Sequence, residues 1–363
     1  MSKKLSLENL KLRDHNSVRL KCTLVHAQMT DIFSKLDVPN EHSKITADVL
    51  TSASLRGVDT HGVGKLTGYA KAILSGKYTI PQSISISTES ETTALISCGN
   101  GLGFVGAHTA MEMSIDKATK CGIGMVAVKD GHHVGMVGYY PMMALKHGMI
   151  GIAATNASRS VHPTLGVKPL IGTNPIAFAA PAGRERDFVL DMATSTVASG
   201  KIGLAKSLGV KIPSGWVVDS EGDPILEPPN SRHDGWSLTP LGGTVEQGSH
   251  KGYGLALVID ILCGILSGGG FGAQLNGGEN MAWTMAIDIS RFRKLDEFKS
   301  MMDEMIKTMH STPSESIKSP VLVPGDPEWD TYDDRKINGI PVEKGEYAEI
   351  VRMAEFVGSD VII

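Results

Sequence analysis

Residues 92–130, TTALISCGNGLGFVGAHTAMEMSIDKATKCGIGMVAVKD, contain a β-prone run, a stretch of helical periodicity and a second β-prone run. The two outer runs, TTALISC (92–98) and GMVAVKD (124–130), are short and mostly apolar, as strands buried in a sheet are. Between them, the residues from Val105 to Lys120 predict a helix. This order of elements favours an α/β core.

Four further β-prone runs follow toward the C-terminus, with helical stretches between them. They are MIGIAATNA (149–157), PIAFAAPA (175–182), FVLDMATS (188–195) and AWTMAIDI (282–289). A short helix is predicted from Tyr140 to His147, and an apolar helix begins near His250. The segment from Asp219 to Gly248 is rich in Pro, Gly, Asn and Asp, so we expect a long surface excursion there.

Both ends of the chain have helical periodicity. Apolar residues recur at helical spacing in 18–36, 42–55 and 66–74, in the Met-rich stretch 292–309 and near 346–356. We therefore expect an α/β domain at residues 85–288, and a mainly helical domain built from residues 1–84 plus 289–363.

Composition narrows the class of protein. The chain has 363 residues, 41% hydrophobic and 20% charged, which is typical of a globular enzyme. A net charge of -4 gives no positive field for nucleic acid. The N-terminal stretch MSKKLSLENLKLRDH has no apolar signal region, and no apolar run is long enough to span a membrane. We expect a cytoplasmic protein that binds neither membrane nor nucleic acid.

The four cysteines lie far apart and form no CxxC pair, so neither a zinc knuckle nor a disulfide scaffold is indicated. Reduced and mostly buried thiols are expected, and no metal site is predicted. The stretch GLGFVG (101–106) matches the dinucleotide fingerprint GxGxxG. Because Asp130 follows later than the usual acidic residue, and the chain holds 41 glycines, we interpret this match as a structural turn.

Two histidine-bearing segments carry the residue types of a proton-transfer site. In RGVDTHGVGKL (56–66), His61 can exchange a proton near neutral pH, and Lys65 or Arg56 can hold a carboxylate. In GHHVG (131–135), one of the two histidines can face a ligand. The alternatives are a histidine that packs at a helix junction and a surface histidine pair.

Three more segments have the character of binding walls: IGTNP (171–175), DMATS (191–195) and HKGYG (250–254). Lys251 lies near a helix start, where its positive charge interacts unfavourably with the helix dipole. A cofactor phosphate bound there would offset this repulsion. A solvated lysine is the alternative. Asp191 is either a ribose acceptor or a turn former.

Taken together, these segments resemble the type-2 malate/L-lactate dehydrogenase family. RGVDTHGVGKL, GHHVG, IGIAATNAS, IGTNPIAFAAPA, FVLDMATS with SGKI, and HKGYGLALVIDILCGILSGGGFG follow one another in the order of that family, from about residue 18 to Pro341. The resemblance implies a homodimeric oxidoreductase with a mixed-sheet, non-Rossmann cofactor domain. It also implies NAD or NADP, with NAD favoured, and a small 2-hydroxy acid. Malate is the expected substrate; lactate, sulfolactate, ureidoglycolate or an imino acid are alternatives.

The resemblance also implies roles for particular residues. His61 or His133 exchanges the proton, with Thr60 and Lys65 beside the substrate. The implied cofactor contacts are Asn156, Ala157, Ser158, Val189, Leu190, Asp191, Met192, Ala193, Lys251, Gly252, Gly325, Asp326 and Pro327. This chain departs from the family at Thr60, where serine is usual, and at Lys65, where arginine is usual. Lysine keeps the charge but loses the bidentate fork, which leaves the substrate open.

Two other classes remain as rivals. A metal-dependent hydrolase would use Asp59, His61, the pair His132 and His133, and Asp191 as ligands, although no HExxH pair is present. A non-catalytic binding protein would keep the scaffold without turnover. Activity that survives a chelator, together with an absorbance change at the reduced-nicotinamide band, would exclude the first. Thermal stabilisation by NADH without turnover on a panel of 2-oxo acids would favour the second.

Overall fold

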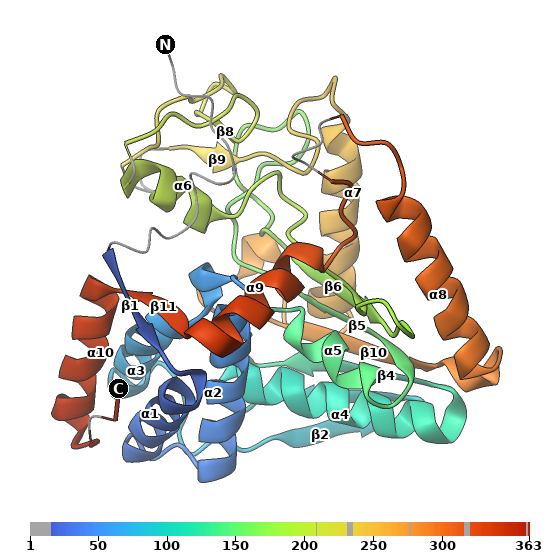
Figure 1. The fold of residues 1–363 in the computed structure, drawn as a ribbon. Coiled ribbons are helices and arrows are strands. Elements are labelled where there is room, and N and C mark those ends of the chain that lie inside the picture. The colour runs from blue at the N-terminus through green and yellow to red at the C-terminus, as the bar shows by residue number, and fades with distance from the viewer. Residues whose placement is uncertain (1–15, 208, 231–234, 276, 316–319, 361) are drawn as a thin grey trace.

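The computed structural model describes residues 16–207, 209–230, 235–275, 277–315, 320–360 and 362–363, so the N-terminal stretch 1–15 lies outside it. At its centre is a seven-stranded sheet with the order β2-β3-β4-β10-β5-β6-β7 (Figure 1). The strands are β2 (Ser85–Glu89), β3 (Thr93–Ser97), β4 (Ile123–Lys129), β5 (Met149–Thr155), β6 (Ile176–Ala180), β7 (Phe188–Met192) and β10 (Ala282–Asp288). Within this sheet β3 and β4 pair in parallel and the other neighbours pair antiparallel. The expected mixed α/β sheet is confirmed.

Both faces of the sheet are covered, which explains why its central strands are apolar on both sides. On one face, Val126 and Val128 of β4 belong to the cluster that contains α4 (Gly103–Cys121) and α5 (Tyr139–Leu145). On the other face, Ala127 packs with Ile259 and Cys263. These two come from α7 (Ser249–Ile259) and the π-helical turn Asp260–Ile265 that continues it.

The two ends of the chain meet beside the sheet. A two-stranded antiparallel sheet joins β1 (Ser17–Leu20) to β11 (Ile340–Glu343). Around it lie α1 (Cys22–Lys35), α2 (Asn40–Leu55), α3 (Leu66–Leu74), α9 (Asp326–Asn338) and α10 (Lys344–Val357) (Figure 1). The largest apolar cluster contains residues from these helices and from the sheet together. The helices of the chain ends and the sheet thus share one apolar core. The division into two domains stays a prediction.

A third region lies above the sheet in Figure 1 and contains α6 (Ser199–Ser207), β8 (Val217–Val218) and β9 (Ser237–Leu238). Val217 and Leu238 are buried there in a cluster with Val161 and Ile202. The prediction of a surface excursion over residues 219–248 is therefore wrong for Ser237–Leu238. Residues 231–234 of that segment lie outside the described residues.

The other differences from the predicted elements are local. The first predicted helix begins later, because Ser17–Leu20 form β1. Two helices were not predicted, α6 and α9, and α8 (Leu295–His310) matches the predicted Met-rich helix. Of the four free cysteines, Cys98 and Cys263 are buried, whereas Cys121 is exposed. The thiols are thus less buried than expected.

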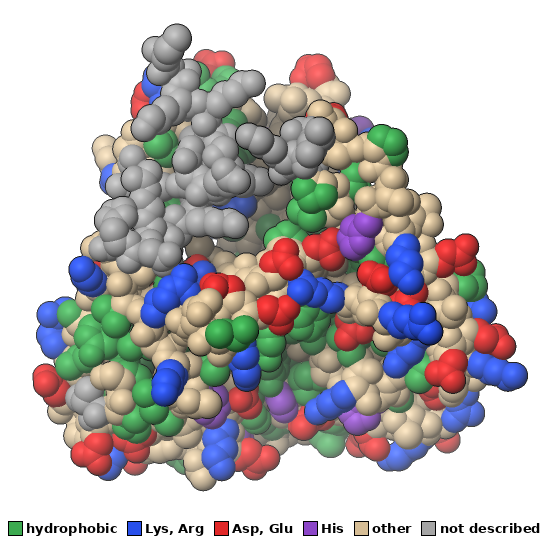
Figure 2. Space-filling view, in the orientation of Figure 1, with side chains coloured by type: hydrophobic (Ala, Val, Ile, Leu, Met, Phe, Trp, Pro, Cys, Tyr) green, Lys and Arg blue, Asp and Glu red, His purple; other side chains and the backbone are tan. Residues whose placement is uncertain are grey.

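The GxGxxG match begins in the bend before α4 and continues into the first turn of that helix, and its glycines have the structural role interpreted from the sequence. A Cβ atom on Gly103 would lie 1.9 Å from the carbonyl oxygen of His132, and one on Gly106 would lie 2.6 Å from Sγ of Cys98. These glycines let α4 approach the sheet, so their role is packing. In the part of the chain that the structure describes, no helix is long and apolar enough to cross a bilayer. Basic and acidic side chains are interspersed over the face shown in Figure 2.

Candidate active site

A cavity of about 1990 Å³ opens between the helices of the chain ends, the strand end of β7 and the region that contains α6. Its walls include the loop that follows α2, the loop 133–138 after β4, residues 189–193, α6 and the segment 322–328. Segments that are far apart in sequence thus share one space. Each of the two predicted histidine loops contributes a side chain to it.

The first histidine lies on a short 3-10 helix, Asp59–His61, directly after α2. Oγ1 of Thr60 lies 2.9 Å from Nδ1 of His61. Asp59 is held from the other side by Arg335 of α9, whose Nη2 donates to Oδ2 at 3.0 Å. The turn that presents His61 is therefore anchored to a helix near the end of the chain.

The second histidine, His133, follows β4 and faces the first. The rings of His61 and His133 are stacked, with centroids 5.3 Å apart and 19° between their planes. Nδ1 of His133 lies 2.7 Å from the hydroxyl of Tyr69 on α3, and the backbone N–H of Gly135 donates to the same atom at 3.2 Å. His132, its neighbour in sequence, turns away and bonds the carbonyl of Gly278 at 2.8 Å. Only one member of the histidine pair faces the cavity, as expected.

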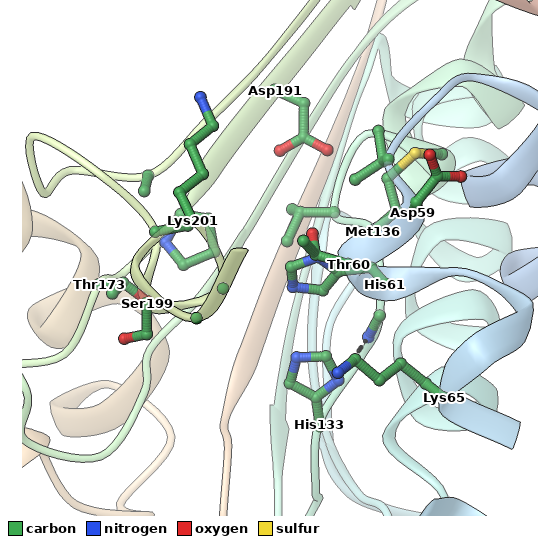
Figure 3. A pocket seen from close by; sticks show the side chains of 18 of the residues that line it. Asp59, Thr60, His61, Lys65, His133, Met136, Thr173, Asp191, Ser199 and Lys201 are labelled. Carbon is green, nitrogen blue, oxygen red and sulfur yellow. Dashed lines mark hydrogen bonds between the residues drawn. The ribbon is translucent and has the colours of Figure 1, made fainter. Parts of the chain in front are cut away.

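Both cavity histidines are held neutral. Burial, together with a smaller contribution from the charge of Lys65, lowers the pKa of His61 to about 4. Burial lowers the pKa of His133 to about 3, helped by His61 and Lys65. Burial also raises the pKa of Tyr69, so its hydroxyl keeps its proton at neutral pH. In Figure 3 the Lys65 side chain extends toward the ring of His133.

The strand end of β7 supplies a carboxylate to the same cavity. Oδ2 of Asp191 accepts a hydrogen bond of 2.7 Å from the backbone N–H of Gly138. The surrounding cavity wall raises the pKa of Asp191 to about 6 by desolvation, and the nearby charge of Arg56 opposes this rise. Figure 3 shows Asp191 on the same side of the cavity as Thr60 and His61.

Arg56 is unusual because its charge is buried. The residue is 4% exposed, and its guanidinium carbon lies 4.3 Å from the centre of the Trp329 ring. Neither Nη1 nor Nη2 has a hydrogen-bond partner among the described residues. Burial lowers its pKa, while the charges of Glu328 and Asp191 raise it. An orphaned cation in a cavity wall is suited to a ligand that brings an acceptor.

Helix α6 lines the cavity opposite the histidines. A Cβ atom on Gly200 would lie 3.0 Å from Cγ2 of Thr60, so the first turn of α6 packs on the histidine loop. Ser199 and Lys201 of this helix line the cavity, across from His61 (Figure 3). A larger residue at position 200 would displace Thr60 or the helix.

The structure brings most of the predicted site residues together. Those that line the cavity are Thr60, His61, Lys65, His133, Ala157, Ser158, Val189, Leu190, Asp191, Met192, Ala193, Gly325 and Pro327. Asn156, Lys251, Gly252 and Asp326 are not part of this lining. Contact of the whole predicted set with a cofactor stays a prediction.

The four residues outside the lining have other surroundings. Asn156 is fully buried, and its Oδ1 accepts from the backbone of Met281 at 2.9 Å. Oδ2 of Asp326 lies 2.7 Å from Nε2 of His310. Gly252 packs against the backbone of Leu241, and Lys251 is exposed on α7.

Sequence reasoning missed several residues that shape the cavity, among them Tyr69, Lys201, Arg335 and Glu346. Tyr69 appeared only as part of an apolar helical stripe, and Lys201 lies in the quoted SGKI motif without an assigned role. Arg335 and Glu346 come from the C-terminal region, where no motif marks them. The carboxylate of Glu346 packs on Gly64, where a Cβ atom would lie 2.4 Å from its Oε1.

Comparisons with known proteins agree with this geometry. The family model described as malate/L-lactate dehydrogenase matches residues 21–351. The chain belongs to this family. It is 41% identical over 351 residues to a protein named malate dehydrogenase from Pyrococcus abyssi, covering 95% of this chain and 96% of that protein. It is 38% identical over 331 residues to malate/(S)-sulfolactate dehydrogenase from Methanothermus fervidus, covering 89% and 94%.

The fold of this dehydrogenase matches solved members. The structure of malate dehydrogenase from Pyrococcus horikoshii OT3 superimposes with a TM-score of 0.88 at 36% identity, covering 96% of this chain and 98% of that chain. The protein is therefore a hydroxy acid dehydrogenase by family and by fold. The rival interpretation as a metal-dependent hydrolase is not supported by these relatives.

Proposed function

We propose that this dehydrogenase interconverts malate and oxaloacetate, with NAD or NADP as the hydride carrier. The observation that carries the proposal is the pair of stacked, neutral imidazoles, His61 and His133, in one cavity with Lys65 and the Asp191 strand end. Relatives named malate or malate/(S)-sulfolactate dehydrogenase support this substrate class.

The residues present fit a nicotinamide cofactor. Nη1 and Nη2 of Arg56 are buried without a partner in the cavity wall, and Asp191 offers an acceptor beside them. Gly325, at φ 107°, lets the backbone of segment 322–328 come close to Val189. We propose that Ala157, Ser158 and residues 189–193 hold the cofactor, with Gly325 and Pro327. When bound, the cofactor supplies the acceptor for the hydride that leaves C2.

The protein's own side chains hold the acid and move the proton. Lys65 holds the substrate carboxylate, and Thr60 with the two histidines surrounds the C2 oxygen. During oxidation one imidazole takes the hydroxyl proton, which requires the neutral form that burial favours for both rings. In reduction the same atom returns the proton.

Replacement of each histidine by asparagine tests this assignment. Loss of general acid-base catalysis lowers turnover by about a hundredfold or more. The assay follows reduced-nicotinamide absorbance with oxaloacetate, pyruvate, sulfopyruvate and glyoxylate-type acids, and with each reduced cofactor. Near-normal turnover in both variants would refute the proposal. Cofactor binding without turnover on any acid would favour the non-catalytic rival.

We propose NAD as the preferred cofactor. The wall near the strand end carries the acidic residues Asp191 and Glu328, both of which line the cavity. A 2'-phosphate placed beside them would be repelled. A ratio of kcat/KM for NADH over NADPH above one supports this preference, and a ratio below one contradicts it.

We also propose that the enzyme is a homodimer and that the outer face of α7 and its π-helical continuation forms the interface. Val258, Ile261, Ile265 and Leu266 are 46%, 51%, 59% and 58% exposed on this face. Such apolar exposure is typical of an interaction surface. Sedimentation of the wild type and of Ile261→Asp tests it, because only the wild type should sediment as a dimer. A cytoplasmic location, expected from the sequence, stays a prediction.

A further inference from the structure

We infer that the two stacked histidines have different roles. His61 exchanges the proton with the C2 oxygen, whereas His133 only donates a hydrogen bond to that oxygen. Tyr69 is a positioning residue that fixes the tautomer of His133. This inference rests on the proposed function, because it divides the roles within the same site.

The tautomer of His133 follows from the donors around its Nδ1. The backbone N–H of Gly135 donates to this atom at 3.2 Å. A backbone amide nitrogen has a proton and can only donate, so Nδ1 must present a lone pair. A neutral imidazole carries one proton, which then lies on Nε2.

Tyr69 supplies a second donor to the same atom. Its hydroxyl lies 2.7 Å from Nδ1 of His133, and burial keeps this hydroxyl protonated. The Tyr69 ring is 8% exposed and packs edge-on against Phe104, with centroids 4.9 Å apart. The alternative tautomer would point its Nδ1 proton at the N–H of Gly135. Nδ1 is therefore the acceptor, and Tyr69 donates to it.

This tautomer limits what His133 can do. Its Nε2 carries a proton and has no lone pair, so the atom cannot accept the proton of a substrate hydroxyl. It can donate a hydrogen bond to the C2 oxygen, which stabilises the negative charge that develops there. His133 thus acts as a fixed electrophile.

His61 is free to take the other role. Among the described residues, the partner of Nδ1 of His61 is the hydroxyl of Thr60, at 2.9 Å. A hydroxyl can either donate or accept a hydrogen bond. When Nδ1 donates to Thr60, Nε2 presents a lone pair. In oxidation a bound, oxidised nicotinamide would accept the C2 hydrogen as hydride, with its electron pair. The hydroxyl proton passes to Nε2 of His61 and the C2–O bond becomes a carbonyl; reduction reverses these transfers.

Glutamine substitutions separate the two roles. The side-chain NH2 of glutamine can replace the Nε2 proton of imidazole as a donor, but it cannot exchange a proton near neutral pH. His133→Gln is expected to keep kcat for oxaloacetate within about tenfold of the wild type, whereas His61→Gln loses about a hundredfold or more. Equal losses in the two variants, or the reverse order, would overturn the inference.

Tyr69→Phe tests the positioning role. It removes one donor and leaves that of Gly135, so we expect a partial loss of kcat with little change in KM. The matched control is Tyr139→Phe, because Tyr139 also lies near a histidine, with its hydroxyl 3.5 Å from Nδ1 of His108, but outside the cavity lining. A loss in Tyr139→Phe as large as in Tyr69→Phe would overturn the role of Tyr69.

Nitrogen NMR of the protein labelled with 15N-histidine shows which ring nitrogen carries the proton, and this measurement does not depend on enzymatic activity. The variants above assign the two rings among the 12 histidines. At pH 7 we expect His133 protonated at Nε2 and His61 protonated at Nδ1. A proton on Nδ1 of His133 would overturn the inference. An enzyme inactive on all the acids would refute the proposed function instead, and the spectrum would still decide the tautomer.

Discussion

Arg335 of α9 holds both carboxylate oxygens of Asp59, a residue 276 positions earlier in the chain. It also donates to the backbone carbonyl of Ser54, at the end of α2. The Arg335 side chain is 10% exposed and that of Asp59 26%. One guanidinium thus ties the C-terminal helices to the turn that presents Thr60 and His61.

Arg335→Met is expected to destabilise the protein strongly. Removing one partner of a buried pair leaves the other charge unpaired, at a cost of roughly 3 kcal/mol. The matched control is Arg19→Met, because the pair of Arg19 and Asp334 is largely exposed and contributes less than about 1 kcal/mol. Urea unfolding of both variants checks this. Equal losses in the two variants would contradict the role of Arg335.

The neutral histidines predict how stability depends on pH. Burial lowers the pKa values of His61 and His133 to about 4 and about 3, below the ordinary 6.5. Between these values and pH 6.5 the unfolded chain binds more protons than the folded one. The free energy of unfolding is therefore highest above pH 6.5, where both rings are neutral in the folded and the unfolded chain. It decreases as the pH falls toward 4, because only the unfolded chain can bind these protons readily.

The double variant His61→Asn, His133→Asn should lose less stability than the wild type between pH 7 and pH 4.5. Thermal unfolding at a series of pH values measures this difference. Parallel curves for the two proteins would show that these rings do not titrate as expected. A His26→Asn variant controls for the loss of a histidine outside the cavity.

Asp191 should have the opposite dependence. Its pKa is raised from the ordinary 3.8 to about 6, mainly by desolvation, so stability falls as the pH rises from 3.8 through about 6, and the loss is complete above that pH. Asp191→Asn keeps an acceptor for the N–H of Gly138 and removes the charge. We expect the variant to gain melting temperature over the wild type at pH 8, with a smaller gain at pH 5. A gain that is larger at pH 5 would exclude this explanation.

The sequence predicted the sheet well because its strands are buried on both faces. In the run from Ile123 to Lys129, apolar residues point to both faces of the sheet. This pattern is typical of a strand whose two faces are both covered. In contrast, β2 (Ser85–Glu89) is exposed at every position, so it has no apolar pattern to detect. Helix α9 was missed for a similar reason: its sequence is strongly polar, and Pro327 in its first turn suggested a loop.

The site was predictable only in part. His61, His133 and the Asp191 strand end lie in motifs, and the structure places all three in one cavity. The partners that determine their chemistry come from elsewhere in the chain. Neither the burial of Arg56 against Trp329 nor the bond from Tyr69 to His133 has a local pattern, because both depend on how distant helices pack.

Lys77 is positioned to bind the second carboxylate of malate. The cavity continues from Tyr69 along Gly68 and Ala72 of α3 to Lys77, which lines its wall. A Cβ atom on Gly68 would meet nothing within 4 Å, so this part of the helix face is open. The ammonium group of Lys77 packs against Gly278. A Cβ atom added to Gly278 would lie 2.3 Å from Nζ of Lys77. A substrate carboxylate that extends away from the histidines can therefore meet this charge.

Lys77→Gln should lower kcat/KM for oxaloacetate by about fivefold, as expected for a partly solvated charge pair. Pyruvate, which lacks the second carboxylate, should be reduced at an unchanged rate. Lys71→Gln is the matched control, since Lys71 lies on α3 outside the cavity lining. Assays at low and high salt should show the oxaloacetate effect shrink, because salt screens exposed charges. Equal losses for oxaloacetate and pyruvate would mean that Lys77 acts on the fold of the site and does not select the dianion.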